Sequence, residues 1–221
     1  MYTRPALPDP LDARSLAAAV RALAARDARL AAVVERHGPP PLWARRGGFR
    51  TLARMILEQQ VSLASAATLF RRLDRELDGG IRAATVAAEG ERGLRARGLT
   101  RQKAAYFVAL ARAVEDRDLR FGELHRLSDA AARAALEEVR GIGPWTSGIY
   151  LLMVLGRPDV WPPGDLALHV ALGRLRGQNR VPSSAEAARY AERWRPWRSV
   201  AARILWHDYL SERPARGAGG E

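Results

Sequence analysis

Two residue types are almost missing from this chain of 221 residues, which contains no cysteine and one lysine, Lys103. Without cysteine the chain has no disulfide, thiolate zinc site, cysteine nucleophile or cysteine-ligated iron–sulfur cluster. It has four histidines, and none of them lies at the sequence spacing of a metal-ligand pair. We therefore expect a protein without a zinc centre or other cofactor.

Long apolar runs are also missing, since none reaches the roughly 18 residues that a membrane-spanning helix needs. The segment Met1–Asp12 carries three prolines and lacks the apolar core of a secretory signal. We therefore expect no membrane contact and a cytoplasmic, nucleoid-associated location.

Positive charge is abundant, because 36 Lys and Arg residues face 24 Asp and Glu residues and the formal net charge is +12. A strongly basic chain favours an anionic partner, most often nucleic acid. A solvated basic surface would have the same composition. Charge alone therefore supports a nucleic-acid partner without establishing it.

Alanine, leucine and arginine dominate and β-branched runs are few, which predicts helices throughout. The expected class is all-α. Sequence periodicity and capping residues predict helices near residues 11–37, 49–58, 63–73, 83–91, 101–115, 129–139, 145–155, 166–175, 184–194 and 197–211.

The segment Gly141-Ile142-Gly143 separates two predicted helices, in the manner of a hairpin. Glycines permit a tight turn and the close approach of another backbone. The amides of Gly143, Trp145 and Thr146 would open the second helix, and a helix N-terminus suits a phosphate. A plain helix–helix turn remains the alternative.

Asp165 and the pair Gln59-Gln60 are further candidate functional residues. Asp165 is a lone carboxylate after the loop Trp161-Pro-Pro-Gly, where it can act as a helix cap or as a placed acid. Gln59 and Gln60 lie at a junction of two predicted helices, where side chains can project, although an ordinary polar loop would look the same.

The segments Val139–Thr146 and Pro162–Asp165 together resemble the helix–hairpin–helix, Gly/Pro-Asp (HhH-GPD) superfamily of DNA base-excision glycosylases. Within that superfamily the chain is similar to the 3-methyladenine DNA glycosylase II (AlkA-type) branch. Further matching segments are residues 56–62, 98–104 and 194–199, and the similarity spans roughly residues 45–210.

The resemblance implies two helical lobes with a helix–hairpin–helix motif and an active-site cleft between them. Residues 1–44 would form an N-terminal helical segment that packs on the C-terminal helices, residues 45–212 the glycosylase core, and residues 213–221 a disordered tail. The β-rich N-terminal domain of some family members is not expected here.

The resemblance also implies roles for individual residues. Asp165 matches the catalytic aspartate, which stabilises positive charge on the sugar. Gln60 matches the residue that fills the gap left by an extruded nucleotide. The DNA-binding hairpin would consist of Gly141, Ile142, Gly143 and Thr146.

The base pocket implied by the resemblance contains aromatic side chains, which attract a cationic alkylated purine. Trp145 and Trp197 match pocket positions, although any tryptophan is often a core residue. Weaker candidates for the lining are Gln59, Trp161 and Ile149, and Ile149 stands where relatives can carry a tyrosine.

Trp145 also occupies the position at which relatives with lyase activity carry a lysine, so a Schiff-base mechanism is disfavoured. The expected activity is monofunctional hydrolysis of the N-glycosidic bond of alkylated purines in damaged double-stranded DNA, by a monomer. The alternatives are excision of uracil, hypoxanthine or oxidised bases, and a non-catalytic DNA-binding module.

Family hairpins can hold a monovalent cation on backbone carbonyls. Here these would be the carbonyls of Glu137, Val139 and Ile142, and no side chain demands the ion.

Overall fold

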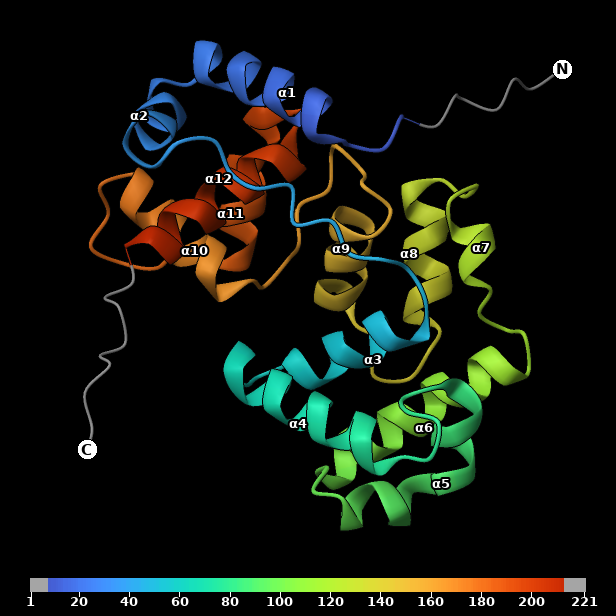
Figure 1. Ribbon diagram of the computed structural model, residues 1–221. Coiled ribbons are helices and arrows are strands. Elements are labelled where there is room, and N and C mark those ends of the chain that lie inside the picture. Colours follow the sequence, from blue (N-terminus) through green and yellow to red (C-terminus); the bar gives the residue numbers. More distant parts are fainter. Residues whose placement is uncertain (1–7, 213–221) are drawn as a thin grey trace, which may run out of the picture. The chain divides into compact units, whose positions relative to one another are not determined.

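A computed structural model describes residues 8–212, and every regular element in that range is a helix (Figure 1). The expectation of an all-α fold is therefore confirmed. No helix in the described range is long and apolar enough to cross a membrane. The chain divides into two compact units: one contains Arg45–Leu155, and the other contains Pro8–Ala44 and the chain from Gly156 onward.

The first unit contains seven helices within its described residues. They are α3 (Phe49–Glu58), α4 (Leu63–Glu76), α5 (Ala83–Ala96), α6 (Arg101–Glu115), α7 (Phe121–Leu124), α8 (Asp129–Glu137) and α9 (Pro144–Met153). Helix α3 packs on α4, α6 and α9, while α5 pairs with α6 and α8 with α9. The buried side of α3 includes Leu52, Met55 and Ile56, each fully buried.

Side-chain caps begin three of these helices. The hydroxyl of Ser62 accepts a hydrogen bond from Ser65 N, and those of Thr100 and Ser128 play the same part for α6 and α8. A side-chain oxygen at this position satisfies an amide that has no partner within the helix.

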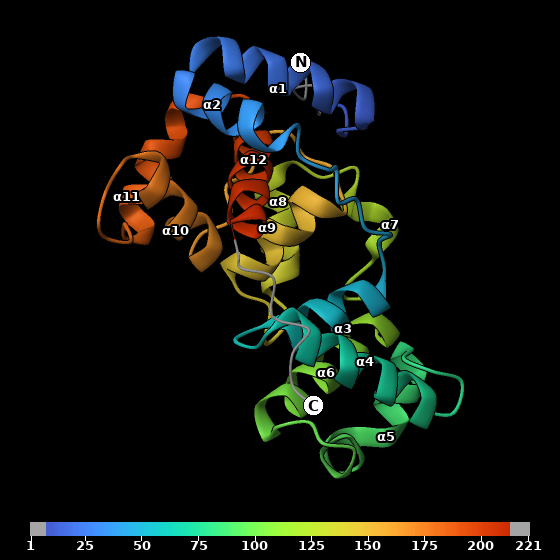
Figure 2. The same cartoon turned by 60° about the vertical axis from the view of Figure 1, so that its left-hand side comes forward.

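The second unit is built around α12 (Arg198–Ser211), which packs on α1 (Ala13–Arg26), α2 (Ala28–His37) and α10 (Leu166–Leu175) (Figure 2). Helix α11 (Ser184–Ala191) and a 3-10 turn η1 (Glu192–Trp194) complete the unit. Helix α12 is buried on most of its sides, and even Arg203 is 1% exposed. Its guanidinium donates to the carbonyls of Leu42 and Ser199, and burial lowers its pKa to about 10.

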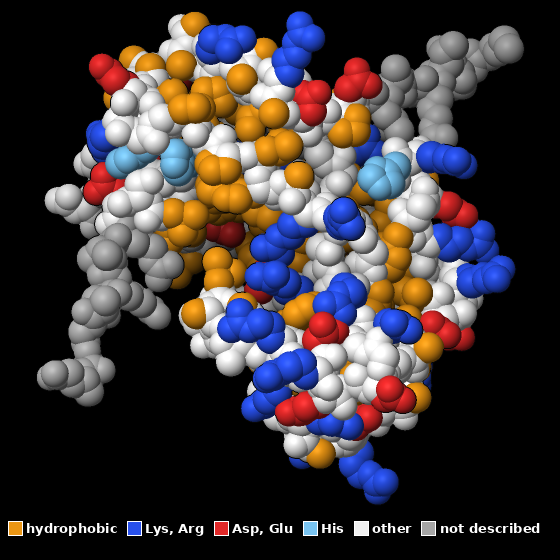
Figure 3. Space-filling view, viewed as in Figure 1, with side chains coloured by type: hydrophobic (Ala, Val, Ile, Leu, Met, Phe, Trp, Pro, Cys, Tyr) orange, Lys and Arg blue, Asp and Glu red, His pale blue; other side chains and the backbone are white. Residues whose placement is uncertain are grey.

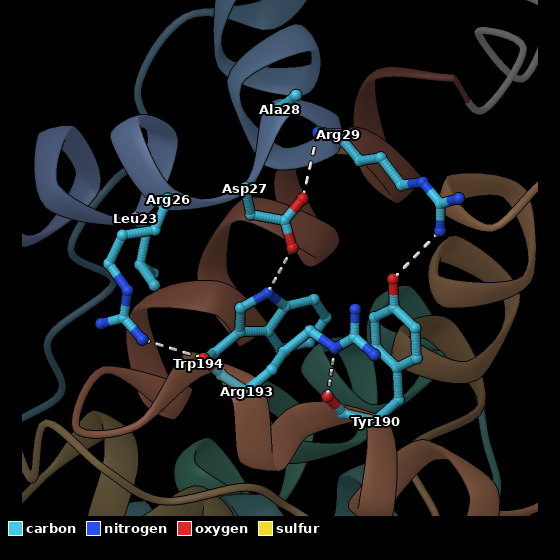
Figure 4. A pocket seen from close by; sticks show the side chains of 8 residues that line it. All are labelled: Leu23, Arg26, Asp27, Ala28, Arg29, Tyr190, Arg193 and Trp194. Atoms are coloured by element: carbon cyan, nitrogen blue, oxygen red, sulfur yellow. Dashed lines mark hydrogen bonds between the residues drawn. The ribbon is translucent and has the colours of Figure 1, made fainter.

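The single helix predicted over residues 11–37 is wrong, because Asp27 divides it into α1 and α2. Asp27 Oδ1 accepts hydrogen bonds from the amides of Arg29 and Leu30, so it caps α2. Its Oδ2 accepts the indole N–H of Trp194 at 2.9 Å. Figure 4 shows this pair in a pocket where the α1–α2 junction faces η1. The tertiary partner thus stabilises a break that local periodicity does not reveal.

Smaller differences concern individual helices. The helix predicted over residues 184–194 stops at Ala191 and continues as η1, and the helix predicted over residues 83–91 bends at Gly90 and continues to Ala96. Helix α7 was not predicted. The tail predicted at residues 213–221 lies outside the described residues.

Replacement of Asp27 by Ala should lower the free energy of unfolding by about 2–3 kcal/mol, because the change removes a helix cap and leaves a buried indole N–H without an acceptor. Urea denaturation followed by circular dichroism measures the change. Asp12 caps α1 through Ser15 N at an exposed site and supplies the control. Equal losses for Asp27→Ala and Asp12→Ala would contradict the role given to the Trp194 bond.

Candidate functional site

The glycine hairpin links α8 to α9 within the first unit. Gly141 has φ +96°, a conformation that favours glycine, and Ile142 N donates to Val139 O at 3.0 Å to close the turn. Gly143 is the N-cap of α9 and Pro144 its first residue, and no described side chain caps this helix end. The N-terminal end of α9 thus keeps the partial positive charge that suits an anion.

The two glycines of the hairpin differ in what surrounds them. A Cβ atom added at Gly141 would lie 2.2 Å from the ring of Tyr106, far inside van der Waals contact. A Cβ atom added at Gly143, where φ is −101°, would meet no protein atom within 4 Å. Gly141 is therefore required by the fold, whereas the fold itself does not require Gly143.

A polar network joins the two helices of the hairpin. Ser147 Oγ donates to Glu137 Oε1 at 2.6 Å, and Arg133 Nη1 donates to Pro144 O and to Ser147 Oγ. Ser147 is fully buried. These hydrogen bonds hold the start of α9 against α8, so the turn between them is already ordered without a ligand.

The turn after α3 lies beside the hairpin. Gln59 Nε2 donates to Gly141 O and to Thr146 Oγ1, both at 2.9 Å. Gln60 follows with φ +58°, in the left-handed region, and its side chain is exposed. The structure therefore brings together Gln59, Gly141 and Thr146, three residues that the sequence had singled out, and it leaves Gln60 exposed beside them.

Asp165 belongs to the other unit, where it is 8% exposed and forms the N-cap of α10. Its Oδ1 accepts the amide of Leu168 at 2.9 Å and the indole N–H of Trp206 at 3.1 Å. The capping role raised from the sequence is confirmed. Both of these hydrogen bonds end on Oδ1, and together they hold the carboxylate in one orientation as an acceptor.

Trp206 is the partner that sequence reasoning missed. It lies on α12, 41 residues beyond Asp165, and is 7% exposed. The only local signal is an aromatic residue within an apolar helix, which is typical of a core position. The contact of Asp165 with Trp206 arises because α10 packs on α12.

His169 lies one helical turn after Asp165 on α10 and is 7% exposed. Its Nε2 is buried without a hydrogen-bond partner among the described residues. Burial lowers the pKa of His169, and the nearby Asp165 carboxylate opposes that shift. The net effect favours a neutral imidazole next to Asp165.

The predicted pocket residues occupy different environments. Trp145 on α9 and Trp197, the N-cap of α12, are each half-buried. Trp161 is 7% exposed and lies 5.9 Å from the Trp194 ring, as in a packed core. Ile149 is 4% exposed. The hydroxyl of the neighbouring Tyr150 accepts a hydrogen bond from Gly48 N, and burial raises the pKa of Tyr150 to about 12. A pocket role for any of them stays a prediction.

Arginine side chains cover part of the first unit. Figure 3 shows Lys and Arg side chains gathered over α3 and α4. The exposed arginines of these helices are Arg50, Arg54, Arg71, Arg72 and Arg75. Arg50 pairs with Asp74, and that ion pair lowers the pKa of Asp74 to about 2. A basic surface of this kind suits a polyanion.

One group of described residues has the donor set of a metal site. Ligand atoms of His37, Asp208 and Glu212 lie within 4.8 Å of one another, a proximity that sequence spacing did not indicate. Arg36 Nη1 lies 3.8 Å from Asp208 and 3.7 Å from Glu212. Arg36 therefore already supplies a cation to the same two carboxylates.

The proposed monovalent-cation site lies on the hairpin carbonyls of Glu137, Val139 and Ile142. Val139 O already accepts the amide of Ile142, which leaves it one lone pair for an ion. Such an ion would stabilise the turn and would take no part in bond cleavage. The cation site stays a prediction.

Comparison with known families identifies the chain's lineage. The family described as HhH-GPD superfamily base excision DNA repair protein matches residues 53–196, well over half of the chain. The chain belongs to the HhH-GPD superfamily. The hairpin at residues 141–143 and the Pro-Gly-Asp segment that ends at Asp165 lie within the matched range.

Individual relatives cover most of this superfamily member. DNA-3-methyladenine glycosylase 2 of Escherichia coli (strain K12) is 30% identical over 172 residues, which are 72% of this chain and 57% of that protein. YfjP of Bacillus subtilis (strain 168) is 29% identical over 184 residues, 80% of this chain. The chain spans 64% of the length of YfjP, so it is shorter than these curated relatives.

A solved structure confirms the fold. The 3-methyladenine DNA glycosylase Mag1 of Schizosaccharomyces pombe, solved with abasic DNA, has a TM-score of 0.78 at 23% identity. The match covers 85% of this chain and 94% of Mag1. At that identity the similarity establishes the helical architecture alone.

The two hairpin glycines should respond differently to replacement by Ala. Gly143→Ala should keep the wild-type melting temperature and weaken duplex DNA binding, because its methyl group meets open space in the protein and would meet a phosphate in the complex. Gly141→Ala should lower the melting temperature, because Tyr106 must move and φ is positive. Differential scanning fluorimetry and fluorescence anisotropy measure both quantities, and wild-type DNA affinity in Gly143→Ala would contradict the phosphate role.

Proposed function

We propose that this chain is a monofunctional DNA glycosylase that hydrolyses the N-glycosidic bond of alkylated purines in double-stranded DNA and leaves an abasic site. The observation that carries the proposal is Asp165, an almost buried carboxylate held by Leu168 N and Trp206 Nε1 at the start of α10. A helix cap alone needs no second donor from a distant helix. Superfamily membership and the name of the E. coli relative support the same activity.

The reaction begins with extrusion, because a base inside the duplex is out of reach of a side chain. The hairpin amides bind the phosphate backbone, and Gln60 enters the gap that the flipped nucleotide leaves. The exposed side chain of Gln60 and its left-handed backbone suit this task. Backbone contacts of this kind do not depend on sequence, which fits a repair enzyme that searches chromosomal DNA.

Cleavage then breaks the bond between C1′ and the base nitrogen. The alkylated base is cationic, so it leaves with the bonding electron pair as a neutral base, and positive charge develops on the sugar. The Asp165 carboxylate stabilises that charge, and water adds to C1′ and releases a proton. Trp206 restricts the motion of the carboxylate by donating to Oδ1.

Selectivity for alkylated purines is assigned to Trp145 and Trp197. An indole face attracts a cationic base by roughly 0.5–2 kcal/mol relative to a neutral one. Both side chains are half-buried, so each keeps accessible surface. A neutral lesion would gain less from the same rings.

Lyase chemistry is not part of the proposal. It needs an amine that attacks C1′. The chain's one lysine, Lys103, donates from Nζ to Leu57 O at 2.7 Å, and burial lowers its pKa. Its ammonium group is thus already engaged in a backbone contact within the first unit. We propose that the protein acts as a monomer on nucleoid DNA and hydrolyses the bond with water alone.

Replacement of Asp165 by Asn should reduce single-turnover excision by at least roughly a hundredfold, because it removes the charge opposite the sugar cation. Asn caps a helix as well as Asp, so the fold should persist. Asp27→Asn is a matched control, since Asp27 also caps a helix and also accepts a tryptophan N–H. Gel analysis of abasic sites measures excision and anisotropy measures binding; near wild-type excision by Asp165→Asn would overturn the catalytic role.

A panel of lesion duplexes should rank 3-methyladenine and 7-methylguanine above hypoxanthine and uracil, because the cationic bases gain both from the indoles and as leaving groups. 1,N6-ethenoadenine extends the panel to a bulky alkylation product. Release of each base is measured by chromatography after a fixed time. A preference for uracil, hypoxanthine or an oxidised base would assign the enzyme to another lesion class, and DNA binding without any release would indicate a non-catalytic module.

A further inference from the structure

The turn that carries Gln60 starts where α3 ends, and it is short. Gln59 is the C-cap of α3 with extended backbone angles, Gln60 is left-handed, and Ser62 already caps α4. A non-glycine residue in the left-handed region carries a conformational cost and persists when its neighbours hold it. The neighbours of Gln60 therefore determine where its side chain points.

Gln59 supplies one of these restraints. Its Nε2 donates one proton to Gly141 O and the other to Thr146 Oγ1, each at 2.9 Å. A backbone carbonyl accepts only, so the amide nitrogen must face it. Thr146 is 1% exposed, which places this bond away from competing water. Both amide protons of Gln59 are thus donated to hairpin residues.

The end of α3 is held from other sides as well. Lys103 Nζ donates to Leu57 O, one of the carbonyls that a helix end leaves without a partner. Glu58 is 8% exposed and pairs with Arg45 at 2.9 Å and with Arg54 at 3.1 Å. Gln59 therefore follows a helix end that is held in place, and its side chain is bonded to the hairpin.

We propose that Gln59 is a positioning residue that couples the hairpin to the Gln60 turn, so that the phosphate-binding element and the gap-filling side chain act as one preorganised surface. The inference rests on the proposed function and deepens it. It assigns Gln59 to the extrusion step, whereas the sequence had suggested a place in the base pocket. Removal of the Gln59 amide would slow extrusion of the nucleotide if Gln59 is a positioning residue. It would slow the steps after extrusion if Gln59 lines the base pocket.

The variants are Gln59→Met, which keeps the side-chain length and removes the donor, and Thr146→Val, which keeps the shape and removes one acceptor. Thr68→Val is the matched control, because Thr68 is exposed on α4 of the same unit and, among the described residues, accepts a surface hydrogen bond from Arg71. Melting temperatures are measured first, so that each rate is compared between folded proteins.

The substrates are two duplexes with 1,N6-ethenoadenine, one with thymine opposite the lesion and one with the lesion in a single-nucleotide bulge. An unpaired base costs less to extrude. Gln59→Met should lose roughly tenfold in single-turnover rate on the paired duplex and less than about twofold on the bulge. Thr146→Val should show the same pattern with a smaller loss, and Thr68→Val should match wild type on both.

A second readout does not depend on excision. Duplexes that carry a stable abasic analogue with 2-aminopurine as the 3′ neighbour report insertion of a side chain through a rise in fluorescence. Gln59→Met should bind this duplex and give a smaller rise than wild type. Wild type that excises no alkylated purine but gives the full rise in 2-aminopurine fluorescence would refute the proposed function. The fluorescence of Gln59→Met would still test the coupling role.

The coupling role is overturned if Gln59→Met loses the same factor on paired and bulged lesions, which would place Gln59 in the base pocket. It is also overturned if Gln59→Met retains wild-type rates on both substrates together with a wild-type fluorescence rise. A double variant of Gln59→Met and Thr146→Val should lose less than the product of the single losses, because both changes remove the same bond.

Discussion

The proposed function depends on the placement of one buried carboxylate, that of Asp165. Asp165 keeps one orientation while nearly all of its surface is withdrawn from water, where a polar group without hydrogen bonds is costly. The amide of Leu168 and the indole of Trp206 supply donors to Oδ1, so the group that caps α10 is also the carboxylate to which we assign the catalytic role. His169 lies one helical turn after Asp165 on α10, and burial lowers the pKa of its imidazole.

The proposed function sets a second constraint, because the hairpin would have to present its backbone amides to a phosphate from a rigid turn. Gly141 is rigid because its backbone packs against Tyr106, and the link of Ser147 with Glu137 joins the two helices. Gly143 stays open on its outer side. Rigidity before binding lowers the entropy lost on binding, which would favour the proposed phosphate contact.

Charge is organised rather than merely abundant. Within the described residues, buried acids have cationic or N–H partners, as Glu58 has in Arg45 and Arg54 and Asp208 has near Arg36. Exposed arginines also gather on α3 and α4, where a basic surface favours a polyanion (Figure 3). The one lysine lies where a compact ammonium reaches the carbonyl of Leu57 at the end of α3.

Several features follow from the sequence by itself. The boundaries of α3, α6 and α10, the caps Ser62, Thr100 and Ser128, and the glycine turn were all predictable, because helix periodicity, capping and turn formation depend on residues within a few positions of one another.

Only the tertiary structure decided the rest. The contacts of Trp206 with Asp165, of Gln59 with Gly141 and of Lys103 with Leu57 join residues 41, 82 and 46 positions apart. The break at Asp27 escaped prediction for the same reason, since its Trp194 partner is 167 positions away. Local patterns specify which segments become helices, but hydrogen bonds between distant helices exist only after packing has brought their donors and acceptors within reach.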